Sequence, residues 1–223
     1  MSISEETTTV AKAPSPAQAP AVDIWDMDPV QDTRDASAST GRPEARPNVI
    51  PATAEEATVL ADGTPVRLRP LRRDERDLVA GFFNGLSAQS RHRRFLRAMP
   101  RLPEPMLRLL VDVDGHRHVA VVAEAGGETA GIARFVALPG DPDTAEVAVT
   151  VADPFQGRGI GGLLLDALRS AAEQAGLGAF VYLVDPTNRP MLRLLRLRGV
   201  QLHFRDGLVE GRQPLTGRRP AAA

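Results

Sequence analysis

A glycine-rich turn at residues 154–162, Pro-Phe-Gln-Gly-Arg-Gly-Ile-Gly-Gly, holds the most distinctive chemistry of the sequence. An amphipathic pattern over about residues 159–175 follows directly, so the turn ends where a helix is expected to begin. A helix start exposes backbone N–H groups and a partial positive charge, and glycines let those groups converge on one point. Arg158 adds a guanidinium that suits phosphate oxygens. The turn therefore predicts a phosphate site, whose length fits a diphosphate better than a single anion.

The glycine spacing alone leaves several interpretations open. It lacks the Gly-Lys-Ser/Thr ending of an ATP-binding loop, whereas Gly157, Gly159 and Gly162 do match the Gly-x-Gly-x-x-Gly dinucleotide fingerprint. That fingerprint opens its fold, but here the turn follows a strand that belongs to a predicted meander. A strand–helix connection without any ligand is also compatible with the glycines.

The elements that must position this turn predict an α+β domain. Strands and helices do not alternate throughout, which argues against a doubly wound sheet and favours a mixed sheet flanked by helices. Strands are expected at 64–71, 117–125, 129–138, 144–151 and 178–184, with a closing hairpin at 200–215. Helices are expected at 72–86, 87–99, 103–113, 159–175 and 188–199.

Two motifs at the expected separation resemble the GNAT N-acetyltransferases. Residues 156–161, Gln-Gly-Arg-Gly-Ile-Gly, match the acetyl-CoA signature Gln/Arg-x-x-Gly-x-Gly/Ala. After the next strand, Asn188 opens a helix that ends at Gly199, as in the second signature, with Val200 replacing the usual Phe. The resemblance covers about residues 64–213 and implies a mostly antiparallel GNAT sheet. The front part is similar to the bacterial protein lysine acetyltransferase branch, although no cyclic-nucleotide-binding domain is expected here.

The resemblance implies direct transfer of an acetyl group from acetyl-CoA, the co-substrate, to an amine. The pantetheine arm would run beside the strand that ends at Val151, and the diphosphate would lie on the glycine turn. The implied acetyl-CoA contacts are Val149, Val151, Gln156, Gly157, Arg158, Gly159, Ile160, Gly161, Gly162 and Asn188.

Such a reaction needs a base, because a lysine-like amine has a pKa of ~10.4 and only roughly one in a thousand is unprotonated at pH 7. A positioned carboxylate contributes on the order of 100–10,000-fold. Glu146 is the predicted base, since it lies on the strand leading to the thioester and faces the same side as Ala148. The resemblance also implies a glutamate base on this strand. A solvated strand-edge glutamate is the alternative, and weaker candidates for the base are Glu124, His118 and Asp112.

The usual general acid of the family is missing. Leu195 occupies the position where many GNAT enzymes have a tyrosine, and Tyr182, the only tyrosine, lies on the preceding strand. Either no side-chain acid is needed, which a thiolate with a pKa near ~8.5 permits, or the domain is a weak catalyst. Alternatives to a protein lysine acetyltransferase are therefore a small-molecule amine acetyltransferase and a non-catalytic acyl-CoA-binding protein.

Composition narrows the remaining classes. The 223 residues include no cysteine, so disulfides, zinc-thiolate sites and a thiol nucleophile are excluded, and no metal site is expected. Without a spanning apolar run or signal peptide, a cytoplasmic protein is expected. The arginines are not interleaved with aromatics, which argues against nucleic-acid binding. The basic helix is most simply a solvated face, although it could attract an acidic protein surface or the adenosine 3′-phosphate. Its arginines are Arg91, Arg93, Arg94 and Arg97.

The chain is expected to divide into three parts. Residues 1–60 are rich in Pro, Ala, Ser, Thr and Asp, and predict a disordered acidic tail. Within it, an apolar island around Trp25 is either a stray cluster or a docking segment. Residues 61–215 form the expected acetyltransferase domain, and 216–223 a disordered C-terminus.

Overall fold

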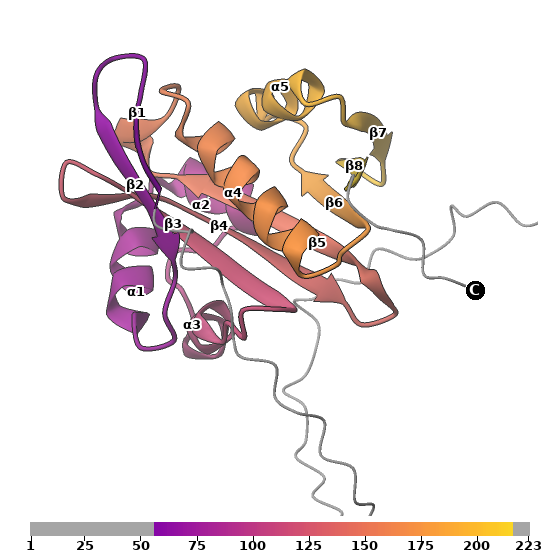
Figure 1. Cartoon of the computed structure of the whole chain (residues 1–223), viewed down its shortest axis with the longest axis horizontal. Helices are drawn as coiled ribbons and strands as arrows, with labels where there is room; N and C mark the ends of the chain where they lie inside the picture. The colour runs from indigo at the N-terminus through magenta and orange to yellow at the C-terminus, as the bar shows by residue number, and fades with distance from the viewer. Residues whose placement is uncertain (1–55, 216–223) are drawn as a thin grey trace, which may run out of the picture. The chain divides into compact units, whose positions relative to one another are not determined.

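The computed structural model describes residues 56–215, which form a mixed eight-stranded sheet with helices on it (Figure 1). The strands are β1 (Glu56–Val59), β2 (Pro65–Pro70), β3 (His118–Ala125), β4 (Glu128–Leu138), β5 (Asp141–Val151), β6 (Ala179–Val184), β7 (Gln201–Arg205) and β8 (Leu208–Pro214). The helices are α1 (Arg76–Gly85), α2 (Ala88–Phe95), α3 (Glu104–Val111), α4 (Ile160–Gln174) and α5 (Arg189–Leu197), with a short 3₁₀ turn, η2 (Asp153–Phe155).

The strand order is β1-β2-β3-β4-β5-β6-β8-β7. Within residues 56–215, β5 and β6 form the only parallel pair, and every other neighbouring pair is antiparallel. A parallel pair needs a crossover connection, and α4 provides it. The predicted α+β fold with a mixed, mostly antiparallel sheet is therefore confirmed.

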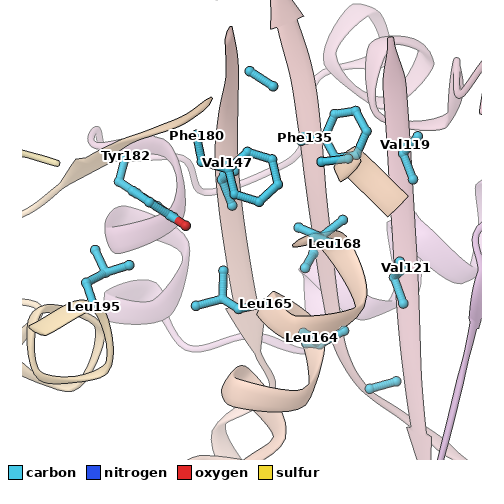
Figure 2. Packing of buried hydrophobic residues seen from close by; sticks show 14 of the residues in the cluster. Val119, Val121, Phe135, Val147, Leu164, Leu165, Leu168, Phe180, Tyr182 and Leu195 are labelled. Atoms are coloured by element: carbon cyan, nitrogen blue, oxygen red, sulfur yellow. The ribbon is translucent and has the colours of Figure 1, made fainter. Parts of the chain in front are cut away.

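Two consecutive residues of β4 show how the helices divide between the faces of the sheet. Successive side chains of a strand point to opposite faces. Phe135 is fully buried in the core cluster that includes Leu164 and Leu168 of α4 (Figure 2). Arg134 instead donates a hydrogen bond to the Leu110 carbonyl in α3. One face is thus covered by α4, and the opposite face by the helices that precede β3.

The core beneath α4 fixes the position of the glycine turn. The apolar residues of α4 recur at helical spacing, so one stripe of the helix is buried against the sheet. Phe135 and Phe180, both labelled in Figure 2, pack against each other, and their ring centroids are 5.9 Å apart. Because α4 is anchored along its length, its first turn is held at the end of β5.

α1 and α2 are shorter than the helices expected at 72–86 and 87–99, and two strands also differ from the expected ones. β1 lies inside the segment expected to be disordered, so the described domain begins at Glu56 rather than at residue 61. This four-residue strand pairs antiparallel with β2 at the edge of the sheet. β5 begins at Asp141, inside an expected loop, because residues 141 and 138 pair across the turn. The Trp25 segment, the rest of the tail and residues 216–223 lie outside the described residues. No helix within residues 56–215 is long and apolar enough to cross a membrane.

Candidate active site

A groove opens where β5 and β6 separate. The two strands pair only over residues 144–147 of β5, whereas β5 continues to Val151. From residue 148 to 151, the edge of β5 that faces β6 lies outside this ladder. The groove beside it has a volume of about 300 Å³. Main-chain N–H and C=O groups on such an edge can pair with an extended ligand, as an added strand would.

The glycine turn and the start of α4 form one end of the groove. Gly157 and Gly159 have φ angles of +75° and +96°, a conformation that glycine adopts without strain. Gly159 is the N-cap of α4, and no side chain caps the helix there. The first N–H groups of α4 and the partial positive charge of the helix start are therefore available to an anion.

Most of the predicted acetyl-CoA contacts come together in this groove. Nine of the ten line it, from the end of β5, the glycine turn and the start of α5: Val149, Val151, Gln156, Gly157, Gly159, Ile160, Gly161, Gly162 and Asn188. Asn188 is the N-cap of α5, where its Oδ1 accepts a hydrogen bond from the Met191 main-chain N–H at 3.3 Å. Met191 and Leu194, one turn apart on α5, line the same wall.

Arg158 is the predicted contact that does not line the groove. Its Nε donates to Asp62 Oδ2 at 2.8 Å, and the guanidinium also hydrogen-bonds the Thr64 hydroxyl. The hydrogen bond from Arg158 is the largest cause that holds the pKa of Asp62 far below its usual range. The side chain of Arg158 therefore ties the glycine turn to the β1–β2 connection instead of pointing into the groove.

Another wall of the groove comes from α2, which was expected to be a solvated face or to attract an acidic protein surface or the adenosine 3′-phosphate. Its lining residues are Ser90, Arg93 and Arg94. Asp153 of η2 fastens this helix by accepting hydrogen bonds from the Ser87 N–H at 2.9 Å, the Ser87 hydroxyl at 2.7 Å and the Ser90 hydroxyl at 2.8 Å. Gln156 Nε2 donates to Ser90 Oγ at 3.1 Å and to the Val151 carbonyl at 3.0 Å. These bonds hold the start of α2 against the end of β5. Ser87 is also the N-cap of α2, where its side chain accepts a hydrogen bond from the Ser90 main-chain N–H.

Glu146 lies on β5 just before the groove opens. It is half-buried, opposite Val136 of β4 and Val181 of β6, and does not itself line the groove. Arg94, which does line it, feels the charge of this glutamate. Burial lowers the pKa of Arg94 to about 10, and the negative charge of Glu146 opposes that shift. The predicted base is therefore next to the groove, on the side where Arg94 forms the wall.

The weaker candidates for the base are engaged elsewhere. Glu124 Oε1 accepts a hydrogen bond from Arg69 Nε at 2.7 Å, and Asp112 pairs with Arg73 at 3.3 Å. His118 is 8% exposed, and burial, followed by the positive charge of Arg134, lowers its pKa to about 3. A histidine with so low a pKa is neutral at physiological pH and is a weak proton acceptor. None of the three lines the groove.

The structure also shows why no tyrosine serves as an acid here. Tyr182 is 2% exposed, and its hydroxyl donates a hydrogen bond to Gln213 Oε1 at 2.7 Å. Burial raises the pKa of Tyr182. Its side chain lies among the core residues of Figure 2, and Leu195 is fully buried in the same cluster. Both residues are part of the core, so neither side chain reaches the groove.

Comparison with known proteins agrees with this arrangement. Residues 86–200 match the model of the acetyltransferase (GNAT) family. Acetyltransferase PA5475 of Pseudomonas aeruginosa is 35% identical over 136 residues, which cover 59% of this chain and 73% of the relative. Acetyltransferase Pat of Mycolicibacterium smegmatis is 34% identical over 126 residues, which cover 55% of this chain and only 38% of that protein.

A solved structure with the same fold is the GNAT domain of S. lividans PAT. It is 30% identical, with a TM-score of 0.70, and the match covers 74% of this chain and 99% of that domain. The chain therefore belongs to the acetyltransferase (GNAT) family, and the predicted enzyme class is confirmed. Acetyl-CoA, the acyl donor of the family, is accordingly the co-substrate.

Proposed function

We propose that this protein is an N-acetyltransferase that acetylates an amine, with a protein lysine as the favoured acceptor and Glu146 as the general base. The observation that carries the proposal is the groove at the β5–β6 opening. The start of α4, which no side chain caps, lies at the end of the groove that follows Val151 of β5. The Glu146 carboxylate lies at the other end, before residue 148. This polarity matches a donor whose phosphates and thioester lie at opposite ends.

The groove suggests how the donor binds. The diphosphate would accept hydrogen bonds from the first N–H groups of α4, where the helix dipole favours negative charge. The pantetheine arm would follow the edge of β5 over residues 148–151, using main-chain groups beyond the ladder with β6. Met191 and Leu194 supply an apolar wall opposite this edge. An arm that runs from the turn along β5 leads toward Glu146.

Direct transfer requires few groups from the protein. The amine nitrogen attacks the thioester carbonyl carbon, a C–N bond forms, and the C–S bond then breaks. The proton lost by the amine passes to the Glu146 carboxylate, directly or through a water, and finally to the departing sulfur. Because a thiol has a pKa near ~8.5, a thiolate is an adequate leaving group without an acid. The burial of Tyr182 is compatible with this route.

A protein acceptor is implied by the resemblance of the sequence to the protein lysine acetyltransferase branch, and exposed positive charge on the domain supports it. Arg97, two residues after the end of α2, is exposed, as are three arginines on α5, and within residues 56–215 none of the four pairs with a carboxylate. The three on α5 are Arg189, Arg193 and Arg196. Exposed positive charge of this kind attracts an acidic protein surface that carries the target lysine.

The test is acetyl transfer by the full chain to a panel of small amines and to whole-cell protein extract, read by mass spectrometry. Lysine-acetylated protein is expected as the main product. Glu146→Gln should lower the rate on the order of 100-fold or more at pH 7. The deficit should shrink toward pH 9, because free amine then becomes about 100 times more abundant.

Glu128→Gln, which changes an exposed glutamate in the β3–β4 turn region, is the matched control and should keep the wild-type rate. A Glu146→Gln variant with the wild-type rate at pH 7 would contradict the assignment of the base. If only small amines are acetylated, the acceptor is a small molecule and the proposal of a protein acceptor is wrong. Binding of acetyl-CoA without transfer to any acceptor would favour a non-catalytic acyl-CoA sensor, an alternative supported by the missing tyrosine.

A further inference from the structure

A buried arginine on β4 has fewer partners than its charge requires. Arg134 is only 5% exposed, and its cross-strand neighbours are Ala120 and Ala148, whose small side chains leave space around it. Its guanidinium donates a side-chain hydrogen bond to the Leu110 carbonyl near the end of α3. Within residues 56–215 no carboxylate forms an ion pair with it. A guanidinium carries five N–H donors, so most of its capacity is left for another partner.

A small cavity lies beside this guanidinium, on the face of the sheet that the helices before β3 cover. Its volume of about 10 Å³ is at the lower limit for one water molecule, so only a single ligand of about that size fits. Arg94 and Arg134 supply the only charged side chains of its lining. The other lining residues are apolar: Leu71, Val79, Phe83, Leu110, Ile132 and Ala148.

The charges around the cavity do not balance. Arg94 and Arg134 contribute two positive charges, and Glu146, which acts on Arg94, contributes one negative charge, so the sum is +1. Burial, and then the neighbouring charge of Arg94, lowers the pKa of Arg134 well below its usual value. Burial, and then the positive charge of Arg134, also lowers the pKa of His118, so this histidine is neutral. Arg134 is almost completely removed from water and Arg94 is half-buried, and two like charges in such positions are unfavourable unless a counter-charge joins them.

We propose that this cavity binds a single small monovalent anion of the chloride class, held between the guanidinium groups of Arg94 and Arg134. The anion would bring the local charge to zero and accept the hydrogen bonds that Arg134 has left over. The size of the cavity and its apolar walls favour a weakly hydrated halide over phosphate or sulfate. The cavity shares Arg94 with the wall of the acetyl-CoA groove, but the proposal concerns anion binding, and its tests do not depend on acetyl transfer.

Thermal unfolding of the full chain in sodium chloride and in sodium gluconate, at matched ionic strength, tests the proposal. Gluconate is too large for the cavity. Chloride at about 100 times its dissociation constant should raise the Tm by about 5–10 °C over gluconate. Arg134→Met should abolish this difference, because it removes one guanidinium and leaves Arg94 balanced by Glu146. Arg108→Met, at an exposed arginine of α3, is the control and should retain it.

A second measurement covers the case in which Arg134→Met fails to fold. Crystals of the wild-type protein grown with bromide should show one anomalous peak between Arg94 and Arg134. Equal Tm values in chloride and gluconate, or a bromide-free cavity, would overturn the proposal. A chloride response that persists in folded Arg134→Met would place the anion elsewhere and would overturn it as well.

Discussion

The substitution Gly161→Asp is expected to weaken acetyl-CoA binding without destabilising the folded protein. Gly161 lies in the first turn of α4 and lines the groove. A Cβ at this position would meet Leu194 Cδ2 at 3.5 Å and Val151 Cγ2 at 3.7 Å, which are ordinary contact distances. Unlike Gly157 and Gly159, it does not have a positive φ. Gly161→Asp therefore introduces a carboxylate without steric clash or backbone strain.

Gly161→Asp should stabilise the folded protein but weaken its binding of acetyl-CoA. Replacing a helical glycine and adding an acid to the first turn each favour folding, by roughly 0.3–1 kcal/mol. The free energy of unfolding should therefore rise by roughly 0.6–2 kcal/mol. Binding should weaken, because like charges about 4 Å apart near a protein surface repel by about 4 kcal/mol. Even half of that value corresponds to an affinity loss of about 30-fold.

Titration calorimetry with acetyl-CoA, accompanied by thermal unfolding, measures both quantities on the same preparations. Gly161→Asn is the matched control, because it has nearly the same shape without the charge and should stay within a few-fold of wild-type affinity. Wild-type affinity in a folded Gly161→Asp protein would refute the placement of the diphosphate at α4. An equal loss in the asparagine variant would attribute the effect to shape and refute the electrostatic argument.

Two further variants test the packing around the site. Gly131→Ala should lower the free energy of unfolding by about 1–3 kcal/mol, because its Cβ would lie 2.8 Å from Leu164 Cδ1 and 3.0 Å from the Thr150 carbonyl oxygen; an unchanged denaturation midpoint would contradict this close approach of β4 and α4. Tyr182→Phe should cost about 1–2 kcal/mol by leaving the Gln213 acceptor without its donor, while kcat stays unchanged. A large loss of kcat in that variant would identify Tyr182 as an acid after all.

The parts of the groove that could be predicted are those in which the main chain restricts the residue type. A turn with two positive φ angles requires glycine, so Gly157 and Gly159 were visible in the sequence, and Asn188 was visible through the family signature and does cap α5. The direction of the Arg158 side chain was not visible. It depends on Asp62, 96 residues away, which is brought close only when β1 and β2 form the edge of the sheet.

The burial of individual side chains was the other property that could not be predicted from the sequence. The arginine-rich helix was expected to present a solvated face, but Arg94 has a pKa lowered by burial and lines both the groove and the inner cavity. Whether a charged side chain is covered depends on what packs over it, here the sheet and the neighbouring helices. β1 escaped prediction for a similar reason, because a four-residue edge strand is defined by its partner more than by its own pattern.

The short parallel ladder between β5 and β6 has a mechanical consequence. It joins the strands β1–β5 to the strands β6, β8 and β7 through only four residue pairs, from Thr144–Ala179 to Val147–Tyr182. The sheet is therefore narrowest at the place where the groove begins. A long ligand seated there would bridge both sections, with β5 and α4 on one side and α5 on the other. The bound co-substrate would then stabilise the junction between the two sections of the sheet, and its release after each turnover would make that junction more flexible.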